Sequence, residues 1–322
     1  MTSTSTDPAA PTVASRRGSR WLGPVLLANL VAEVGIVVTG GLVRVTGSGL
    51  GCPTWPECVD GSVTPTIEQA EGFHKYIEFG NRTLTGVLLL LAAATVLAVW
   101  AWAPRRPMKV AAALVLLGVV GQAVLGGVTV LLGLAPAIVA AHFLVSMALV
   151  AVSSYLWFAR SESSGPPHAL VPPLVTRLGW AAVAVGAGVL ALGTVVTGSG
   201  PHSGDADEPN RFSFDAGTVS WLHADLVMVF IGLVVATWLA ARLTTADDER
   251  GPARAWLVVL GVSLAQGLIG YVQYFTDLPE ALVIAHMLGA SLLVVALTHG
   301  VLSLRRRDVP VPQPAPQPVP SA

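Results

Sequence analysis

Charged residues are scarce in this sequence: Asp, Glu, Lys and Arg make up 11% of its 322 residues, whereas 53% are hydrophobic. The mean hydropathy is +0.68. Because an average soluble domain carries about 25% charged residues, this shortage excludes a water-soluble globular protein. The few charges cluster between apolar runs of about 20 residues, each long enough to cross ~30 Å of hydrocarbon. The sequence therefore predicts an all-α polytopic membrane protein.

A surplus of basic residues is also absent, and cysteine is rare. The net charge of −1 leaves no basic surface for a nucleic acid, so nucleic-acid binding is excluded. The two cysteines, Cys52 and Cys58, are too few for a disulfide framework and lack the partners of a structural zinc site. Whatever role they have, they have it as a pair.

Long apolar runs divide the chain into eight predicted transmembrane spans. Residues 1–20 are rich in Ser, Thr and Pro and are predicted to form a disordered cytoplasmic leader. Residues 305–322 are basic and then Pro-rich, and are predicted to form a disordered cytoplasmic tail. The spans are predicted at about 21–43, 77–102, 108–132, 136–158, 174–197, 219–242, 254–274 and 280–302.

Basic residues are distributed unevenly over the loops between these spans. With the N-terminus in the cytoplasm, fourteen of the 18 Lys and Arg residues face the cytoplasm, and the outer side keeps Arg44, Lys75, Arg82 and Arg211. This asymmetry predicts an integral protein of the cell membrane with both termini in the cytoplasm. It also places Cys52 and Cys58 in the oxidising outer compartment, where we expect them to form a disulfide.

Two sequence patterns occur twice along the chain. The repeated segments are VTGSG at 45–49 and 196–200, and GQAVLGGV at 121–128 with AQGLIGYV at 265–272. Twenty residues separate Gln122 from His142, and the same number separates Gln266 from His286. The second half of the chain therefore resembles the first.

The repeat predicts the domain organisation. Each copy contains four spans, an even number, so both copies enter the membrane in the same orientation. We expect two tandem four-helix bundles of the same orientation, at residues 21–158 and 174–304, joined by a cytoplasmic linker at 159–173.

Three histidines lie at a similar predicted depth. His142, His223 and His286 fall within ~10 Å of the outer surface, and ionisable groups inside a membrane are usually functional. Two imidazoles that face each other across a helical bundle can hold a b-type haem iron, which fits His223 with His286. The alternative is that each histidine is an isolated polar residue bonded to a neighbouring helix. In the repeat, His223 corresponds most nearly to Asn81.

Charged residues near the outer ends of the first two spans have functional and structural interpretations. Arg44 and Arg82 could bind haem propionates in bidentate forks, or could snorkel to the interface. Glu78 stands three residues before Asn81, on the same helix face. It could transfer protons there, or it could be a carboxylate that the helix dipole favours.

Two further pairs of residues leave alternatives open. Glu33 lies in the middle of the first span with Asn29 one turn before it, so a helix-packing hydrogen bond and a functional role are both possible. Cys52 and Cys58 enclose PTWPE, whose prolines and aromatic residue favour a tight turn that could bring the sulfurs into bonding range. Such a bridge could be a structural staple or could take part in redox exchange.

A family resemblance is visible at these residues. The chain contains GGLVRVTGSGLGCPTWPEC at 40–58, then a Glu-x-x-x-Arg at the head of the second span, then one histidine near the outer end of each of spans 4, 6 and 8. This combination resembles the haem A synthases, and the match extends from about residue 21 to 305. The RVTGSG stretch with the Cys-Pro-x-Trp-Pro-x-Cys loop is a specific combination of motifs.

The resemblance implies a function and a set of site residues. It implies oxidation of the C8 methyl of haem O to a formyl group, which yields haem A for terminal oxidases, with haem b as electron carrier in the C-terminal half. It makes His223 and His286 the haem b ligands, His142 a ligand of the substrate haem, Glu78 the essential carboxylate, and Cys52 with Cys58 the outer cysteine pair. The implied partners are haem O, haem A, membrane lipid, a haem O synthase and an electron acceptor.

One position departs from the family pattern. That pattern commonly reads Glu-x-x-His-Arg, whereas this chain has Asn81 in place of the histidine. His74 is a candidate substitute, but on a rigid helix it lies ~10 Å further along the axis. Either residues 72–77 unwind so that His74 reaches the iron, or His142 holds the substrate haem alone and Asn81 leaves a position open beside Glu78. We favour the second arrangement, because an enzyme that releases its haem gains little from two strong axial bonds.

Two other functions fit parts of this pattern. A diheme b-type cytochrome linked to quinone would use the same histidines without changing either haem. A transporter of a lipid-soluble substrate is the weaker alternative, because parallel repeats and clustered histidines have no evident transport logic.

Overall fold

The computed structural model describes residues 13–103, 105–205, 209–246 and 249–307, and long helices dominate them. These helices are α1 (Val13–Val45), α2 (His74–Trp102), α3 (Arg106–Leu131), α4 (Pro136–Ala159), α5 (Pro173–Ser199), α6 (Ala216–Thr244), α7 (Gly251–Phe275) and α8 (Glu280–Ser303). Within the described residues, eight helices are long and apolar enough to cross a membrane. The predicted all-α membrane fold with eight spans is therefore confirmed.

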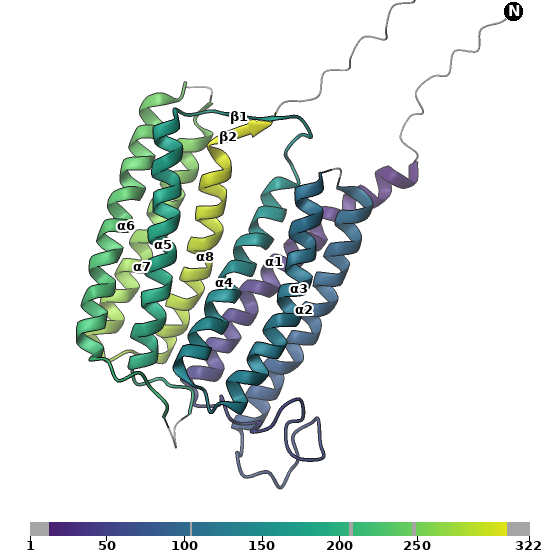
Figure 1. Cartoon of the computed structure of the whole chain (residues 1–322), viewed down its shortest axis with the longest axis vertical. Coiled ribbons are helices and arrows are strands. Elements are labelled where there is room, and N and C mark those ends of the chain that lie inside the picture. The colour runs from purple at the N-terminus through teal and green to yellow at the C-terminus, as the bar shows by residue number, and fades with distance from the viewer. Residues whose placement is uncertain (1–12, 104, 206–208, 247–248, 308–322) are drawn as a thin grey trace, which may run out of the picture.

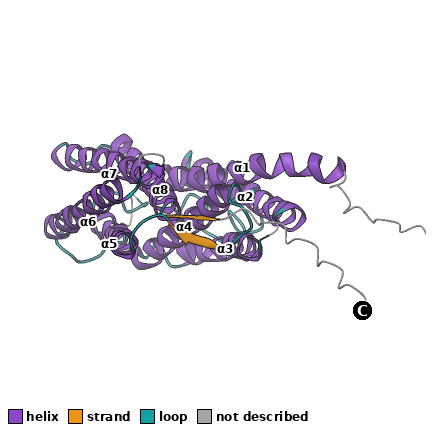
Figure 2. Ribbon diagram, turned by 90° about the horizontal axis from the view of Figure 1, so that it is seen from above, coloured by secondary structure: helices purple, strands orange, loops and turns teal. Residues whose placement is uncertain are grey.

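The helices form two groups of four that stand side by side (Figures 1 and 2). In the first group α1 packs on α2 and α4, and α3 packs on the same two helices. In the second group α6 packs on α5 and α7, and α8 packs on α5 and α7. Each group has its own buried apolar core, and a third cluster joins the groups through α1, α4 and α8.

Proline marks the beginning of four helices. Pro107, Pro136, Pro173 and Pro252 occupy the first or second position of α3, α4, α5 and α7. A proline is tolerated there because the first backbone N–H groups of a helix have no partner within the helix. These positions determine where each span starts, and so they determine the depth of the side chains that follow.

The two groups are also joined through their loops at one end of the molecule. The N–H of Gly49 donates to the carbonyl of Gly204 at 2.8 Å, and a guanidinium nitrogen of Arg44 donates to the carbonyl of Thr197 at 3.0 Å. The repeated VTGSG segments of the two halves therefore lie together, at the C-terminal ends of α1 and α5.

The opposite end carries a short two-stranded antiparallel sheet that no sequence pattern predicted. Strand β1 (Pro167–Ala169) pairs antiparallel with strand β2 (Arg305–Arg307), at the top of Figure 1. Glu162 stabilises it, because its carboxylate accepts from Arg307 at 3.0 Å and from Arg105 at 2.6 Å. The predicted disorder of the tail is thus wrong for residues 305–307, where a carboxylate pairs with the arginines.

The leader also differs from the prediction. Helix α1 begins at Val13, so residues 13–20 are helical rather than disordered. Residues 1–12 and 308–322, which complete the predicted leader and tail, lie outside the described residues.

Candidate functional site

One cavity extends between the two halves of the molecule. Its volume is about 870 Å³, and residues from both groups of helices line it. His142, His223 and His286 all belong to its wall, as do Glu78 and the other site residues predicted near them, namely Arg44, Asn81 and Arg82. The structure therefore brings together side chains that are as far apart in sequence as Arg44 and His286.

Two of the histidines have the same local environment in both halves. The amide Nε2 of Gln122 donates to the backbone carbonyl of His142 at 2.8 Å, and that of Gln266 donates to the carbonyl of His286 at 2.9 Å. These contacts tie α3 to α4 and α7 to α8 at the level of the histidine. The twenty-residue spacing in the sequence thus corresponds to a repeated contact.

A glycine on a neighbouring helix lies beside each imidazole. A Cβ at Gly126 would lie 3.4 Å from Cε1 of His142, and one at Gly270 would lie 3.5 Å from Cε1 of His286. For His223 the glycine is Gly193, where a Cβ would come within 3.2 Å of Cε1. The rings therefore fit closely against helix backbone, which restricts their orientation in the cavity.

The ring nitrogens leave capacity for a ligand. The Nδ1 atoms of His142, His223 and His286 are buried and have no hydrogen-bond partner among the described residues. The Nε atom of Arg44 is likewise buried without a partner in the described part of the chain, and Arg44 lines the same cavity. Buried polar atoms are normally hydrogen-bonded, so this concentration of unpartnered atoms marks a site built for a polar or metal-containing ligand.

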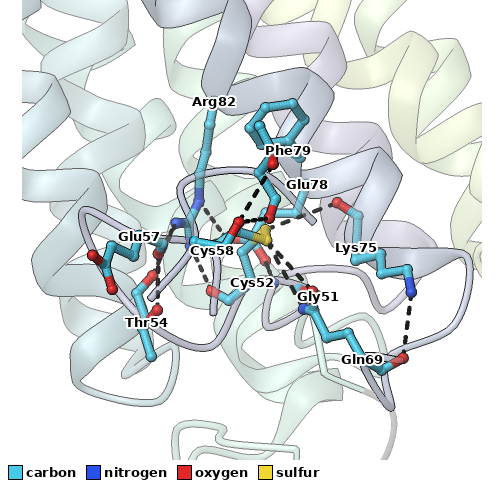
Figure 3. Close-up of a disulfide and its surroundings, with 12 residues drawn as sticks. Gly51, Cys52, Thr54, Glu57, Cys58, Gln69, Lys75, Glu78, Phe79 and Arg82 are labelled. Atoms are coloured by element: carbon cyan, nitrogen blue, oxygen red, sulfur yellow. Dashed lines mark hydrogen bonds and ion pairs between the residues drawn. A yellow bond between two sulfur atoms is a disulfide. The ribbon is translucent and has the colours of Figure 1, made fainter. Parts of the chain in front are cut away.

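Glu78 is anchored near the N-terminal end of α2. Its Oε2 accepts from the backbone N–H of Cys52 at 2.7 Å, and its Oε1 accepts from Nε of Arg82 at 2.9 Å (Figure 3). The side chain is buried although it also lines the cavity. The predicted essential carboxylate is therefore held between the cavity and the loop that follows α1.

Arg82 binds the backbone of this loop. Besides its bonds to Glu78, its NH1 donates to the carbonyls of Thr54 and Glu57 at 2.9 and 3.1 Å, and its NH2 donates to the carbonyl of Cys52 at 2.5 Å. A guanidinium has five N–H donors, and these contacts use all of them. These contacts leave Arg82 no free donor for the predicted propionate contact in this conformation, whereas Arg44 keeps one.

The cysteines are joined as predicted. Cys52 and Cys58 form a disulfide with a Cα–Cα distance of 4.3 Å, and both side chains are fully buried. Gln69 holds the surrounding loop through a bond to the carbonyl of Gly51 at 2.7 Å, and Lys75 donates to the carbonyl of Thr66 at 2.6 Å. Neither sulfur lines the cavity, so the disulfide acts on the site through the loop backbone.

The two residues considered for the missing axial ligand have separate partners. Asn81 lines the cavity, and its Oδ1 accepts from the hydroxyl of Thr39 at 2.7 Å. His74 is exposed, does not line the cavity, and shares a hydrogen bond of 2.8 Å with the hydroxyl of Ser48. Helix α2 begins at His74, so the residues from 74 onward are not unwound.

Trp55 is a site residue that was not expected from the sequence. Its indole lies against Gly127 of α3, where a Cβ would have no room, and it lines the cavity. The repeat contained a signal for this contact, since Tyr271 stands at the position of Gly127 in the second half. Gly127 therefore accommodates Trp55, which lies in the loop between α1 and α2.

Comparisons with known proteins agree with the resemblance. The COX15-CtaA family, described as cytochrome oxidase assembly protein, matches residues 23–202. A haem A synthase of Lysinibacillus sphaericus is 26% identical over 90% of this chain and 97% of its own length. A haem A synthase of a Methylobacterium species is 29% identical, over 90% of this chain and 92% of its own.

A third similarity is shorter. A protoheme IX farnesyltransferase of Thermus thermophilus is 36% identical over 34% of this chain but only 17% of its own length. The family match covers more than half of the chain, and the two haem A synthases align with nearly all of it. The chain belongs to the COX15-CtaA family of cytochrome oxidase assembly proteins.

Proposed function

We propose that this protein is a haem A synthase whose two halves divide the work: the N-terminal half holds haem O at His142, and the C-terminal half holds haem b between His223 and His286. Family membership and the full-length similarity to haem A synthases identify an oxidoreductase that converts haem O to haem A. One observation supports these assignments of the histidines to the two haems. The three histidines line a single cavity that is shared by both halves.

The residues of the cavity fit haem. Each imidazole has an unpartnered buried nitrogen, and the glycine beside it lets the ring pack closely against the neighbouring helix. Arg44 offers a buried donor for a propionate carboxylate. The haem b held between His223 and His286 would supply one-electron transfer.

The first half has a different set of side chains. His142 provides the imidazole for the substrate, while Asn81 presents an amide already bonded to Thr39, so it favours an open position rather than a second strong ligand. Glu78 borders that position with both carboxylate oxygens occupied by Cys52 and Arg82. Oε2 accepts only one N–H and keeps a lone pair that could take a proton, while the bonds to Cys52 and Arg82 hold the carboxylate in place, so its proton transfer depends on the position of the loop.

This asymmetry favours the synthase over the diheme cytochrome. A protein that carried electrons through two permanent haems would gain from two histidine ligands in each half, whereas here the position equivalent to His223 is Asn81. An exchangeable haem suits a weakly ligated site, and a permanent haem suits the paired histidines of the second half.

Pigment analysis tests the function directly. The protein is co-expressed with a source of haem O and purified, and its haems are extracted and identified by mass. We expect haem b together with haem O and haem A. Haem b in both halves, without haem A, would instead establish the diheme cytochrome.

The topology and partners follow from the same proposal. The protein is an integral multi-pass membrane protein, and the distribution of Lys and Arg supports a cytoplasmic location for both termini. The substrate would come from a haem O synthase in the same membrane, and the electrons would leave to an acceptor. Labelling of cysteines introduced into the β1–β2 sheet checks the topology in intact cells, because an impermeant reagent reaches them only if this end lies outside.

A further inference from the structure

Glu33 is a buried carboxyl group that the proposed reaction does not use. It lies in the interior of α1, is 2% exposed, and its Oε1 has no hydrogen-bond partner among the described residues. Residues 83–102 of α2, 143–154 of α4 and 287–298 of α8, the helices that pack on α1, contain no Asp, Glu, Lys, Arg or His. An unpaired charge in such surroundings is very costly, so Glu33 rests as a neutral acid.

Glu33 lies close to the cavity, on the side away from the disulfide loop. Ile36 and Val37, one helical turn further along α1, belong to the cavity wall. On α4 the hydroxyl of Ser146 also lines the cavity and accepts from Gln122 at 2.5 Å. One turn of α1 therefore separates Glu33 from residues of the cavity wall.

A second polar contact lies on the other side of Glu33. Asn29, one turn earlier in α1, is 1% exposed and donates to the hydroxyl of Ser153 at 2.9 Å, while its Oδ1 has no partner among the described residues. Ser153 and Ser146 are seven residues apart on α4, which places them on one face about 10 Å apart along the axis. Asn29, Glu33, Ser153 and Ser146 thus form a polar column on α1 and α4 that ends at the cavity.

The internal repeat indicates that the bundle does not need this column. In the register that aligns the two histidines of α4 and α8, Ser146 corresponds to Ala290 and Ser153 to Leu297. On α5, residues 178–193 contain no carboxylate, amide or hydroxyl side chain. The second half therefore folds with apolar residues where the first half has a polar column, so helix packing alone does not account for it.

We propose that Glu33 is a redox-linked proton-binding group of the N-terminal half. The inference rests on the proposed function, since it requires haem in the cavity. Loss of one electron from that haem to a one-electron acceptor would leave one more positive charge in the cavity, and Glu33 would then release one proton toward the cavity. When an electron returns, Glu33 takes up one proton. The proton on Glu33 thereby balances the charge near the haem from the side of the cavity opposite Glu78.

Infrared difference spectroscopy on the haem-loaded protein tests this assignment. In the reduced-minus-oxidised spectrum we expect a carboxylic acid C=O band that shifts in D2O. The Glu33→Gln variant keeps the size and hydrogen bonding of the side chain but cannot titrate, so it should lose the band completely. Glu33→Asp should retain a shifted band, which keeps the assignment testable if the Gln variant fails to bind haem.

A matched control lies on α4. Ser154 is as buried as Ser153, but its hydroxyl bonds to the carbonyl of Val150 in its own helix at 2.7 Å, so Ser154→Ala should retain the band. An unchanged band in Glu33→Gln, or no carboxylic acid band in the wild type, would overturn the inference. Haem A is measured on the same preparations. A band without haem A production leaves the inference standing and refutes the proposed function, whereas haem A without the band refutes the inference alone.

Discussion

The backbone N–H of Cys52 donates to the carboxylate of Glu78 at 2.7 Å, which joins the disulfide loop to the predicted essential residue. The two residues are 26 positions apart in sequence. Because the cysteines do not line the cavity, this bond and those of Arg82 are the routes by which the loop controls the geometry of Glu78.

Removing the disulfide should therefore impair turnover without removing haem b. In a Cys52→Ser, Cys58→Ser double variant we expect haem A output to fall about tenfold or more, since a displaced hydrogen bond to a charged group is worth roughly 1.5–3 kcal/mol. Haem extraction measures the product, and the reduced b-type absorption reports haem b. Unchanged haem A output would mean that the loop holds Glu78 without the bridge.

Glu78 itself should be needed for the reaction and dispensable for haem binding. Glu78→Gln keeps the side-chain volume but removes the charge that Arg82 balances, and we expect turnover to fall about 100-fold, the lower end for a lost proton-transfer group. Haem A output and total haem content are measured together. Normal output from this variant would reduce Glu78 to an anchor for the loop.

Arg82→Lys distinguishes a loop role from a propionate role. A lysine has three N–H donors and no planar fork, so it cannot replace the five bonds that Arg82 makes to Glu78 and to the carbonyls of the loop. We expect residues 51–72 to be cleaved by protease about tenfold faster or more, as bonds to charged groups are worth roughly 1.5–3 kcal/mol each. If the loop stays resistant while the haem spectrum changes, Arg82 contacts a propionate instead.

His223→Ala and His286→Ala should each abolish the low-spin haem b signal, because each variant removes one of the two imidazoles proposed to hold the iron and puts no other ligand in its place. His142→Ala should leave that signal intact while it lowers the content of substrate haem. His299→Gln is the matched control on α8, since His299 stacks on Phe158 at 4.5 Å between ring centroids and does not line this cavity. Full haem b absorption in either of these two Ala variants would refute the ligand assignment.

His74→Ala should not change the haem spectrum of the substrate-loaded protein, because the His74 ring is bonded to Ser48 outside the cavity. A five-coordinate, high-spin signal is expected both before and after the substitution. Loss of a low-spin bis-histidine signal in this variant would show that His74 moves onto the iron and is the missing ligand.

The sequence alone determined the spans and the depth of the side chains on them. A run of apolar residues must cross the bilayer as a helix, and each residue advances it by about 1.5 Å, so counting residues along the spans is enough to place His142, His223 and His286 near one depth. The twenty-residue spacing from Gln122 to His142 likewise predicted a duplicated environment, which the structure contains as the same amide-to-carbonyl bond.

Only the tertiary structure decided which partner each polar side chain takes. Depth along a helix does not specify the neighbouring element, so Arg82 and Arg44 were equivalent candidates in the sequence, although one binds the disulfide loop and the other faces the cavity with a free donor. The pairing of residues 305–307 with 167–169 also depends on a distant carboxylate, Glu162, that no local pattern reveals. Contacts between segments far apart in the chain arise only when the bundles pack, because packing brings their backbone and charged groups within hydrogen-bonding distance.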